Sequence, residues 1–245
     1  MKSNNVEPAQ MLDDLQLPIA AARLRELQDS PELVNYSFIQ LLREIIEPQY
    51  IDSMNAQFKK NLKQSSLKNK SGKAENLRTG NGRVYHNAPT VQQILTFRFV
   101  EKHQNVGVYG KTGVGKSYFL SACCIEACRA NIRSKAIDYC DLLDELLILS
   151  RKDLQNYRKR VKYYAKFQLL FIDDFCISRY TEEGMKILYH LIKSRADLGT
   201  STMFSSQYSP DEWGKALSYE EKCYGKLDGI RRRLTDGYTI WIEKE

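Results

Sequence analysis

The segment VGVYGKTGVGKSYF, residues 106–119, constrains the fold of this chain more than any other. It matches the pattern G-x-x-x-x-G-K-[ST] without a mismatch, directly after an apolar run typical of a strand and before a helical pattern. In such a loop the backbone N–H groups curl around a phosphate, and the N-terminus of the following helix faces the same anion. An ordinary glycine turn is the alternative, and the strand-loop-helix context argues against it. The segment therefore predicts a loop that binds the phosphates of ATP.

The lysine and the serine that end this loop have expected roles of their own. Lys116 places a positive charge at the β- and γ-phosphate oxygens, and the hydroxyl of Ser117 would ligate Mg²⁺. We expect ATP to contact the whole loop, which consists of Gly110, Lys111, Thr112, Gly113, Val114, Gly115, Lys116 and Ser117.

A pair of carboxylates follows the apolar run in the segment LLFIDDFC, residues 169–176. An acid at the end of a buried parallel strand beside the phosphate loop can hold Mg²⁺ through water, and we assign this role to Asp173. A second acid next to it can orient and deprotonate an attacking water, so Asp174 favours hydrolysis of ATP over transfer to an acceptor. In the alternative interpretation, Asp174 only caps the following turn.

A third polar group ends the expected strand in STMFSSQ, residues 201–207. If this strand neighbours the strand that carries Asp173, the amide of Gln207 would lie beside the γ-phosphate and could position water without adding charge. An ordinary amide at a strand end is the alternative.

Strand and helix patterns alternate after residue 90, which predicts an α/β fold with a parallel sheet covered by helices on both faces. We expect strands at 106–109, 135–139, 169–172, 201–205 and 238–242, and helices at 91–102, 116–130, across 142–166, at 182–197 and near 222–234. The first 64 residues have helical periodicity, with a restart at Pro48, and residues 64–87 have the composition of a linker. The expected domains are a helical N-terminal domain (1–64), a basic linker or arm (65–90) and an ATPase domain (91–245).

The net charge of +7 is concentrated in one part of the chain. Residues 59–83 hold eight basic residues and one acid, while the remainder has equal numbers of both. Such a run favours a polyanion as partner, and a solvated linker is the alternative. The DNA contacts expected here are Lys59, Lys60, Lys63, Lys68 and Lys70.

A second basic stretch, RKDLQNYRKRVKYYAKF, covers residues 151–167. Its apolar residues recur every three to four positions, so one side of a helix would pack on protein and the other would face outward. The outward side matches a phosphate backbone and is expected to carry Arg158, Lys159, Arg160 and Lys162. The tyrosines have the spacing of core residues rather than of platforms for stacked bases.

Three consecutive arginines precede the last expected strand, in KLDGIRRRLTDG. One arginine that reaches the ATP of a neighbouring subunit would stabilise charge on the transferred phosphate. Arg233 is the first candidate for this finger, with Arg231, Arg232 and Arg195 as the others. Surface charge or a DNA contact is an equally reasonable interpretation.

Targeting and cysteine patterns point to the cytoplasm. The sequence has no run of about 18 apolar residues and no signal-peptide pattern at its start, so we expect no membrane partner. Its six cysteines form no Cys-x-x-Cys pair, which argues against a zinc site or a disulfide framework.

Several of these segments together resemble the IstB-type transposition helper ATPases, relatives of the DnaC and DnaA initiators in the AAA+ group. The resemblance covers residues 94–242 and rests on the phosphate loop with its helix, on LLFIDDF, on STMFSSQYSPDEWGK and on IRRRL before a closing strand. It implies an ATP-dependent homo-oligomer that binds double-stranded DNA and works with a transposase. It also implies the roles of Asp173, Asp174 and Arg233 given above, and an initiator-type insertion formed by the helices before residue 169.

Two departures and two alternatives accompany this resemblance. Gln207 stands where the family usually has Asn, and the chain stops after its last strand, so we expect no helical lid. A kinase would need a lid and an acceptor pocket. A DnaC-like helicase loader would share the loop, the acids and the finger. An ATP-binding module without significant hydrolysis is the other alternative. The basic run suits DNA better than a protein groove.

Overall fold

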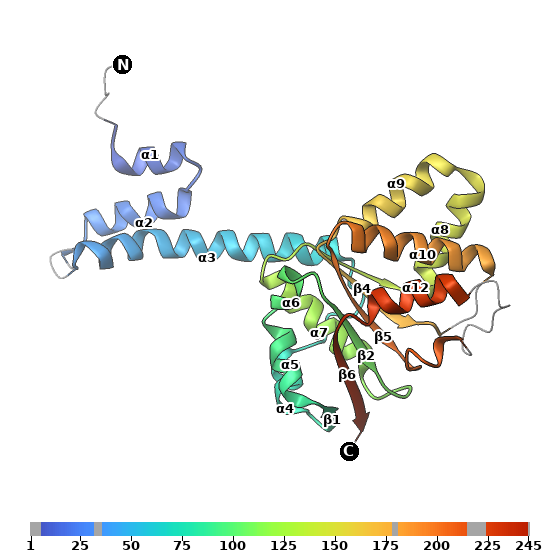
Figure 1. The fold of residues 1–245 in the computed structure, drawn as a ribbon. Coiled ribbons are helices and arrows are strands. Elements are labelled where there is room, and N and C mark those ends of the chain that lie inside the picture. Colours follow the sequence, from blue (N-terminus) through green and yellow to red (C-terminus); the bar gives the residue numbers. More distant parts are fainter. Residues whose placement is uncertain (1–5, 32–35, 178–180, 215–223, 245) are drawn as a thin grey trace. The chain divides into compact units, whose positions relative to one another are not determined.

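The structure is a computed structural model that describes residues 6–31, 36–177, 181–214 and 224–244. These residues form two compact units, Met1–Lys60 and Asn61–Glu245, and Figure 1 shows the elements of each.

The first unit contains helices α1 (Pro8–Asp14), α2 (Pro18–Gln28) and most of α3 (Phe38–Ser65), which ends in the second unit. Within the helical periodicity of the first 64 residues, α1 and α2 are separate helices because the residue before a proline avoids the helical conformation, and Pro18 begins α2. Conversely, α3 continues through Pro48, where we expected a restart. A proline removes one hydrogen bond of the ladder, which interrupts it without ending this helix.

The second unit contains a six-stranded sheet in the order β1-β6-β2-β5-β4-β3. Five of the strands are parallel and were expected from the sequence, whereas β1 pairs with β6 antiparallel. In chain order the strands are β1 (Arg83–His86), β2 (Asn105–Tyr109), β3 (Ser134–Asp138), β4 (Leu169–Phe175), β5 (Ser201–Ser206) and β6 (Gly237–Lys244).

Helices pack on both faces of the sheet, as an apolar parallel sheet requires. On one face lie α5 (Ala88–Leu95) and α7 (Lys116–Arg129), and on the other lie α8 (Tyr139–Lys152), α10 (Glu182–Asp197) and α12 (Tyr224–Leu234), with α9 (Leu154–Ala165) packed on α8 and α10. The short α6 (Arg98–Glu101) follows α5, because Phe97 adopts a left-handed conformation that breaks the single helix expected at 91–102. The main apolar core lies between the sheet and the second set of helices.

The segment expected to be a linker is folded in the structure. It contains α4 (Ala74–Thr79) and β1, and Ala74 and Leu77 are buried. The composition, rich in Lys, Ser, Asn and Gly, did not predict this fold. The segment is stabilised by tertiary contacts with α7 rather than by an apolar periodicity of its own.

The five cysteines within the described residues form no disulfide. Cys223 lies outside those residues, as does Lys222 at the start of the helix expected near 222–234. Of the helices in the described part of the chain, none has the length and apolar composition that a membrane crossing requires.

Candidate nucleotide site and basic surface

The glycine loop leaves the end of β2, between β5 and β6, and leads into α7. Gly110, Gly113 and Gly115 have φ values of +150°, +79° and +105°, which residues with a side chain adopt only with strain. A Cβ atom on Gly110 would lie 2.4 Å from the carbonyl oxygen of Ile242. The loop therefore needs glycine for its conformation and for close packing on β6.

Lys116 is held inside this loop. Its side chain is buried, and its Nζ donates to the carbonyl oxygen of Lys111 at 3.0 Å. Burial lowers the pKa of Lys116, although the nearby carboxylates of Asp174 and Asp173 partly oppose that shift. Because the ammonium has lost most of its water, phosphate oxygens in the loop would restore its missing partners.

Asp173 and Asp174 lie at an irregularity in β4. Between Ile172 and Phe175 the register with β5 shifts, and Asp174 adopts a left-handed φ of +52°. The Ser205 hydroxyl on β5 donates to Asp173 Oδ1 in a short hydrogen bond, and the same hydroxyl oxygen accepts from the Asp174 backbone N–H at 2.9 Å. The bulge thus presents two successive carboxylates at the end of the strand.

The two acids differ in their surroundings. Burial raises the pKa of Asp174, the neighbouring carboxylate of Asp173 raises it further, and Lys116 lowers it. Asp173 instead accepts hydrogen bonds from Ser205 and from the backbone of Asp174. A carboxylate with a raised pKa is a stronger base, which is the property that proton removal from water needs.

Gln207 follows β5 directly, and β5 pairs with β4 as the sequence prediction required. Its side-chain Oε1 accepts a hydrogen bond of 2.8 Å from the Thr112 hydroxyl in the glycine loop. The fold therefore brings the ends of β2, β4 and β5 to one edge of the sheet, where loop, acids and amide meet.

The residues present fit Mg²⁺ bound together with ATP. Ser117 and Asp173, the two predicted ligands, line the same cavity of about 440 Å³, which also borders residues 66–69 and β3. Hydroxyl and carboxylate oxygens suit Mg²⁺, which usually binds few protein groups and completes its shell with phosphates and water. Accordingly, the described residues contain no cluster of three or more His, Cys, Asp or Glu side chains that would hold a metal ion alone.

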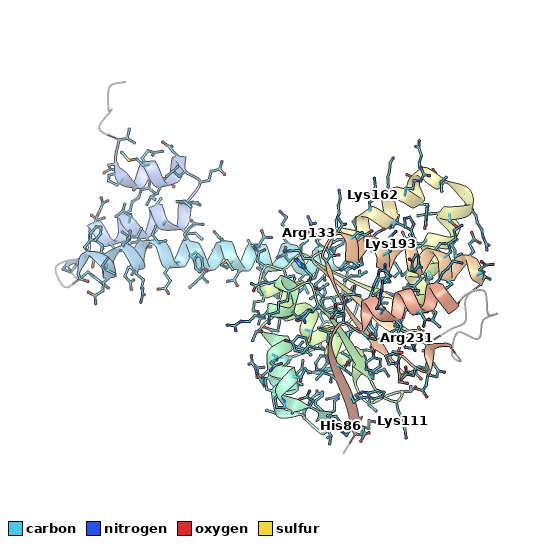
Figure 2. The ribbon with its side chains drawn as sticks, in the orientation of Figure 1. His86, Lys111, Arg133, Lys162, Lys193 and Arg231 are labelled. Carbon is cyan, nitrogen blue, oxygen red and sulfur yellow. The ribbon has the colours of Figure 1, made fainter. Side chains whose placement is uncertain are left out.

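The basic helix expected at 151–167 is α9 with its flanks. Its inner side buries Tyr157, Val161 and Tyr164, which confirms the core position of these two tyrosines, whereas Tyr163 is exposed. Leu154, expected on the same side, is instead 54% exposed at the start of the helix. Arg158, Lys159 and Lys162 are exposed, and Figure 2 shows Lys162 on the outside of this region.

Arg160 differs from the other three predicted contacts on this helix. It forms an ion pair with Glu145 of α8 and stacks on the rings of Tyr163 and Tyr164. A paired arginine offers less net charge to a phosphate, so the structure places Arg160 in a packing contact rather than on the open surface.

The lysines of the first basic run also differ in whether they form ion pairs. Lys59, Lys60, Lys63 and Lys70 are exposed, whereas Lys68 forms a 2.7 Å ion pair with Asp141. Lys135 of β3, which is not among the DNA contacts expected from the sequence, contacts the Ser66 hydroxyl and lies 5.9 Å from the ring of Tyr163 on α9. It therefore joins residues 61–70 to the basic helix, so these two stretches adjoin on the surface of the second unit.

Comparison with known proteins identifies the family. The model for the IstB-like ATP binding protein family matches residues 10–232. The chain belongs to this family. A protein of insertion sequence IS232 from Bacillus thuringiensis subsp. berliner, named for ATP binding, is 28% identical over 148 residues. That match covers 59% of this chain and 58% of the relative, so the chain spans little more than half of the relative's length.

Solved structures with a similar fold support the predicted architecture. AMPPCP-bound DnaA from Aquifex aeolicus has a TM-score of 0.57 at 19% identity, covering 71% of this IstB-like chain and 51% of DnaA. The DnaC helicase loader has a TM-score of 0.50 at 19% identity, covering 63% of this chain and 89% of DnaC. The predicted P-loop fold of the AAA+ type is therefore confirmed.

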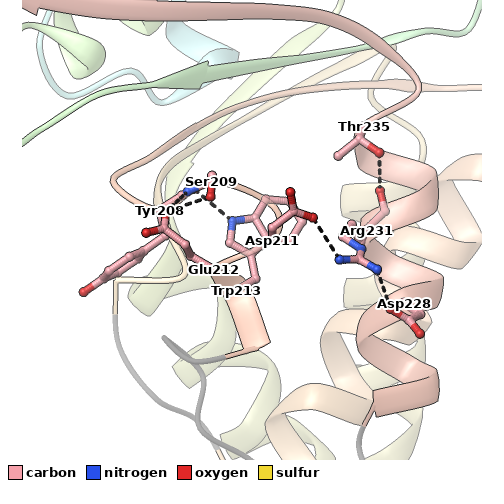
Figure 3. Close-up of polar contacts among 8 residues, drawn as sticks. All are labelled: Tyr208, Ser209, Asp211, Glu212, Trp213, Asp228, Arg231 and Thr235. Atoms are coloured by element: carbon pink, nitrogen blue, oxygen red, sulfur yellow. Dashed lines mark hydrogen bonds and ion pairs between the residues drawn. The ribbon is translucent and has the colours of Figure 1, made fainter.

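The candidate arginine fingers of this IstB-like chain occupy different environments. Arg195 is buried, and its guanidinium donates to Thr202 and to backbone carbonyls, so it cannot reach a neighbouring subunit. Burial lowers the pKa of Arg195 to about 9. Arg231 pairs with Asp211 at 3.2 Å and with Asp228 at 3.0 Å, as Figure 3 shows.

The other two candidates lie at the opposite edge of the sheet from the glycine loop. Arg232 is exposed, and Arg233 donates to the Gly229 carbonyl and lies 5.5 Å from the Tyr189 ring. Both border a cavity that is also lined by Asn105, the first residue of β2, and by Asp236, which directly precedes β6. Neither lies beside the glycine loop of the same chain.

Proposed function

We propose that this IstB-like chain binds and hydrolyses ATP, binds double-stranded DNA, and acts as a nucleotide-switched homo-oligomer with the transposase of an insertion sequence. The observation that carries the proposal is the meeting of Lys116, Asp174 and Gln207 at one edge of the sheet. A loop that only bound ATP would not need a carboxylate of raised pKa and an amide beside it.

Each group has a defined task in hydrolysis. Gln207 orients a water molecule, and Asp174 takes its proton as the water attacks the γ-phosphate. Lys116 and an arginine from a neighbouring subunit, with Arg233 as first candidate, stabilise the charge on the transferred phosphate. Mg²⁺, held by Ser117 and through water by Asp173, would neutralise charge on the β- and γ-phosphates.

DNA binding is supported by the basic surface. Within the second unit, the exposed lysines of residues 61–70 and those of α9 adjoin through Lys135. No group on this surface has a base-reading pattern, so we expect contacts to phosphates and weak sequence preference. Association with a transposase is supported by the name of the IS232 relative, which belongs to an insertion sequence.

Two alternative functions considered from the sequence can be distinguished from this proposal by experiment. A DnaC-like helicase loader would share the ATPase fold, and the likeness to DnaC is a likeness of fold. An ATP-binding module would bind ATP at the loop and release no phosphate. Binding to duplex DNA at low salt separates the first alternative from our proposal, and phosphate release separates the second.

One assay addresses the combined proposal. Phosphate release from Mg·ATP is measured across a range of protein concentrations, with and without duplex DNA. We expect the rate per protein molecule to rise with concentration, because the finger is supplied by a neighbouring subunit, and to rise again with DNA. A rate strictly proportional to protein concentration would contradict a finger in trans. A transposase reading frame next to the gene would support the partner.

A further inference from the structure

Residues 61–83, here called the strap, follow the whole length of the phosphate-loop helix α7. Asn61 donates to the Cys128 carbonyl near the end of α7, and Ser121 donates to the Asn69 carbonyl near its middle. Gly72 packs so closely on the helix that a Cβ atom there would lie 2.3 Å from the backbone nitrogen of Ala122. The strap thus runs antiparallel to α7, towards the glycine loop.

The strap reaches the first turn of α7 through Tyr118. The Tyr118 hydroxyl oxygen accepts from the Lys73 backbone N–H at 3.1 Å and from the Asn76 side-chain amide at 2.6 Å. The ring of the same tyrosine supports the guanidinium of Arg83, whose central carbon lies 4.9 Å from the ring centroid. Residues 73–76 and Arg83 of the strap therefore converge on one side chain beside the loop.

Arg83 touches the glycine loop itself. Its Nε donates to the Val114 carbonyl oxygen at 3.1 Å, and a Cβ atom on Gly115 would lie 2.2 Å from that Nε. The peptide group between Val114 and Gly115 is planar and trans, so its C=O and its N–H point in opposite directions. A donor that fixes the Val114 carbonyl on one side of the loop therefore fixes the Gly115 N–H on the other side.

We propose that Arg83 is a positioning residue of the phosphate loop, which holds the Gly115 N–H in the direction needed to bind the phosphates shared by ATP and ADP. This rests on the proposed binding of ATP at the loop. In the sequence, Arg83 is only the last basic residue of the run 59–83, which favours a polyanion as partner. Its contacts with Val114 and Tyr118 instead direct it to the loop.

Two substitutions of equal length separate hydrogen bonding from charge. Arg83→Gln keeps an N–H donor at the position of the Nε along the side chain, whereas Arg83→Met has a methyl group there. Arg78→Met, at an exposed arginine of α4, is the matched control. The measurements are the dissociation constants of ADP and AMPPCP by calorimetry, the unfolding midpoint without nucleotide, and amide exchange at residues 114–117 without nucleotide.

We expect Arg83→Met to weaken ADP and AMPPCP alike by about tenfold, the effect of one lost hydrogen bond to a charged donor. Arg83→Gln should stay within about threefold of the wild type, since it keeps a hydrogen bond of neutral strength. The Met variant should also exchange its loop amides faster, with little change in the unfolding midpoint.

Three outcomes would overturn the proposal. Wild-type affinity and exchange in Arg83→Met would show that the contact positions nothing. Equal losses in the Gln and Met variants would assign the effect to charge. A loss confined to AMPPCP would place Arg83 on the γ-phosphate. If the wild type itself bound neither nucleotide, the proposed function would fail, while loop exchange in Arg83→Met would still test the role of Arg83.

Discussion

Thr112 in the glycine loop donates its hydroxyl hydrogen to the side-chain oxygen of Gln207 over 2.8 Å. The bond fixes the amide at the end of β5 to the phosphate-binding loop, and it uses the acceptor end of the side chain. Because the side-chain oxygen of Gln207 accepts this bond, its NH₂ group remains as a donor with a fixed orientation. This arrangement suits a residue that positions water at the γ-phosphate.

Gln207→Ala should therefore lower the rate of ATP hydrolysis with little effect on binding. We expect a fall of about 100-fold in kcat, in the range observed when one preorganised donor is removed, with the dissociation constant of AMPPCP within about threefold. Thr112→Val, which removes only the partner hydroxyl, should give a smaller fall. Single-turnover phosphate release measures both. If kcat is unchanged in Gln207→Ala, Gln207 is an ordinary amide at a strand end and has no role in hydrolysis.

The salt dependence of duplex binding tests the basic surface. If about six phosphates are contacted, log affinity should fall with log salt at a slope of roughly −5, near −0.9 per contact. Replacing Lys59, Lys60 and Lys63 with Ala should remove up to about three units of that slope. The control replaces Lys186 and Lys193, exposed lysines of α10, and should leave the slope unchanged. Equal slopes in the triple variant and the wild type would exclude these lysines from the DNA contact.

The alternation of strands and helices made the parallel sheet predictable. β2, β4 and β5 are largely buried on both faces, and short strand patterns separated by helical patterns predict a covered parallel sheet. Once β4 and β5 are neighbours, the places of Asp173 and Gln207 follow, because parallel strands end at the same edge. This part of the candidate site was accessible from the sequence alone.

The strap and the fine geometry of the acids were not predictable in this way. β1 has only four residues and forms by antiparallel pairing with β6. α4 has only six residues. Ser205, whose hydroxyl contacts both acids, resembles any serine of a strand in the sequence. The ion pairs of Lys68 and Arg160 also depend on tertiary contacts, so the run of basic residues overstated the charge available to DNA.

Arg195 should be essential for stability rather than for turnover in trans. Its guanidinium satisfies the carbonyls of Tyr164, Phe167 and Ser201 in a buried position. Arg195→Met should lower the free energy of unfolding by about 3 to 5 kcal/mol, the cost of breaking a buried polar network. Exposed Arg232→Met should change it by less than about 0.5 kcal/mol. Urea unfolding provides both values, and equal stability of the two variants would refute the structural role.

The raised pKa of Asp174 predicts a pH-dependent stability difference in the protein without nucleotide. Burial raises this pKa above the ordinary value of 3.8, so the folded state resists ionisation that the unfolded state undergoes. Asp174→Asn should therefore stabilise the protein by a margin that is smallest below pH 3.8 and grows until the folded carboxyl is ionised. Asn also tolerates the left-handed φ at this position. Thermal unfolding from pH 3 to 8 tests this, and a margin that is constant with pH would contradict it.

The same variant, Asp174→Asn, provides the most direct test of ATP hydrolysis at this site. Nucleotide binding and phosphate release are measured in parallel for the wild type, Asp174→Asn and Lys116→Ala, all with Mg²⁺. Asp174→Asn should bind ATP within about threefold of the wild type and lose at least about 100-fold in phosphate release, because the general base is gone. Lys116→Ala should lose ATP binding itself. Phosphate release by Asp174→Asn at the wild-type rate would contradict the assignment of Asp174 and, with it, the proposed mechanism.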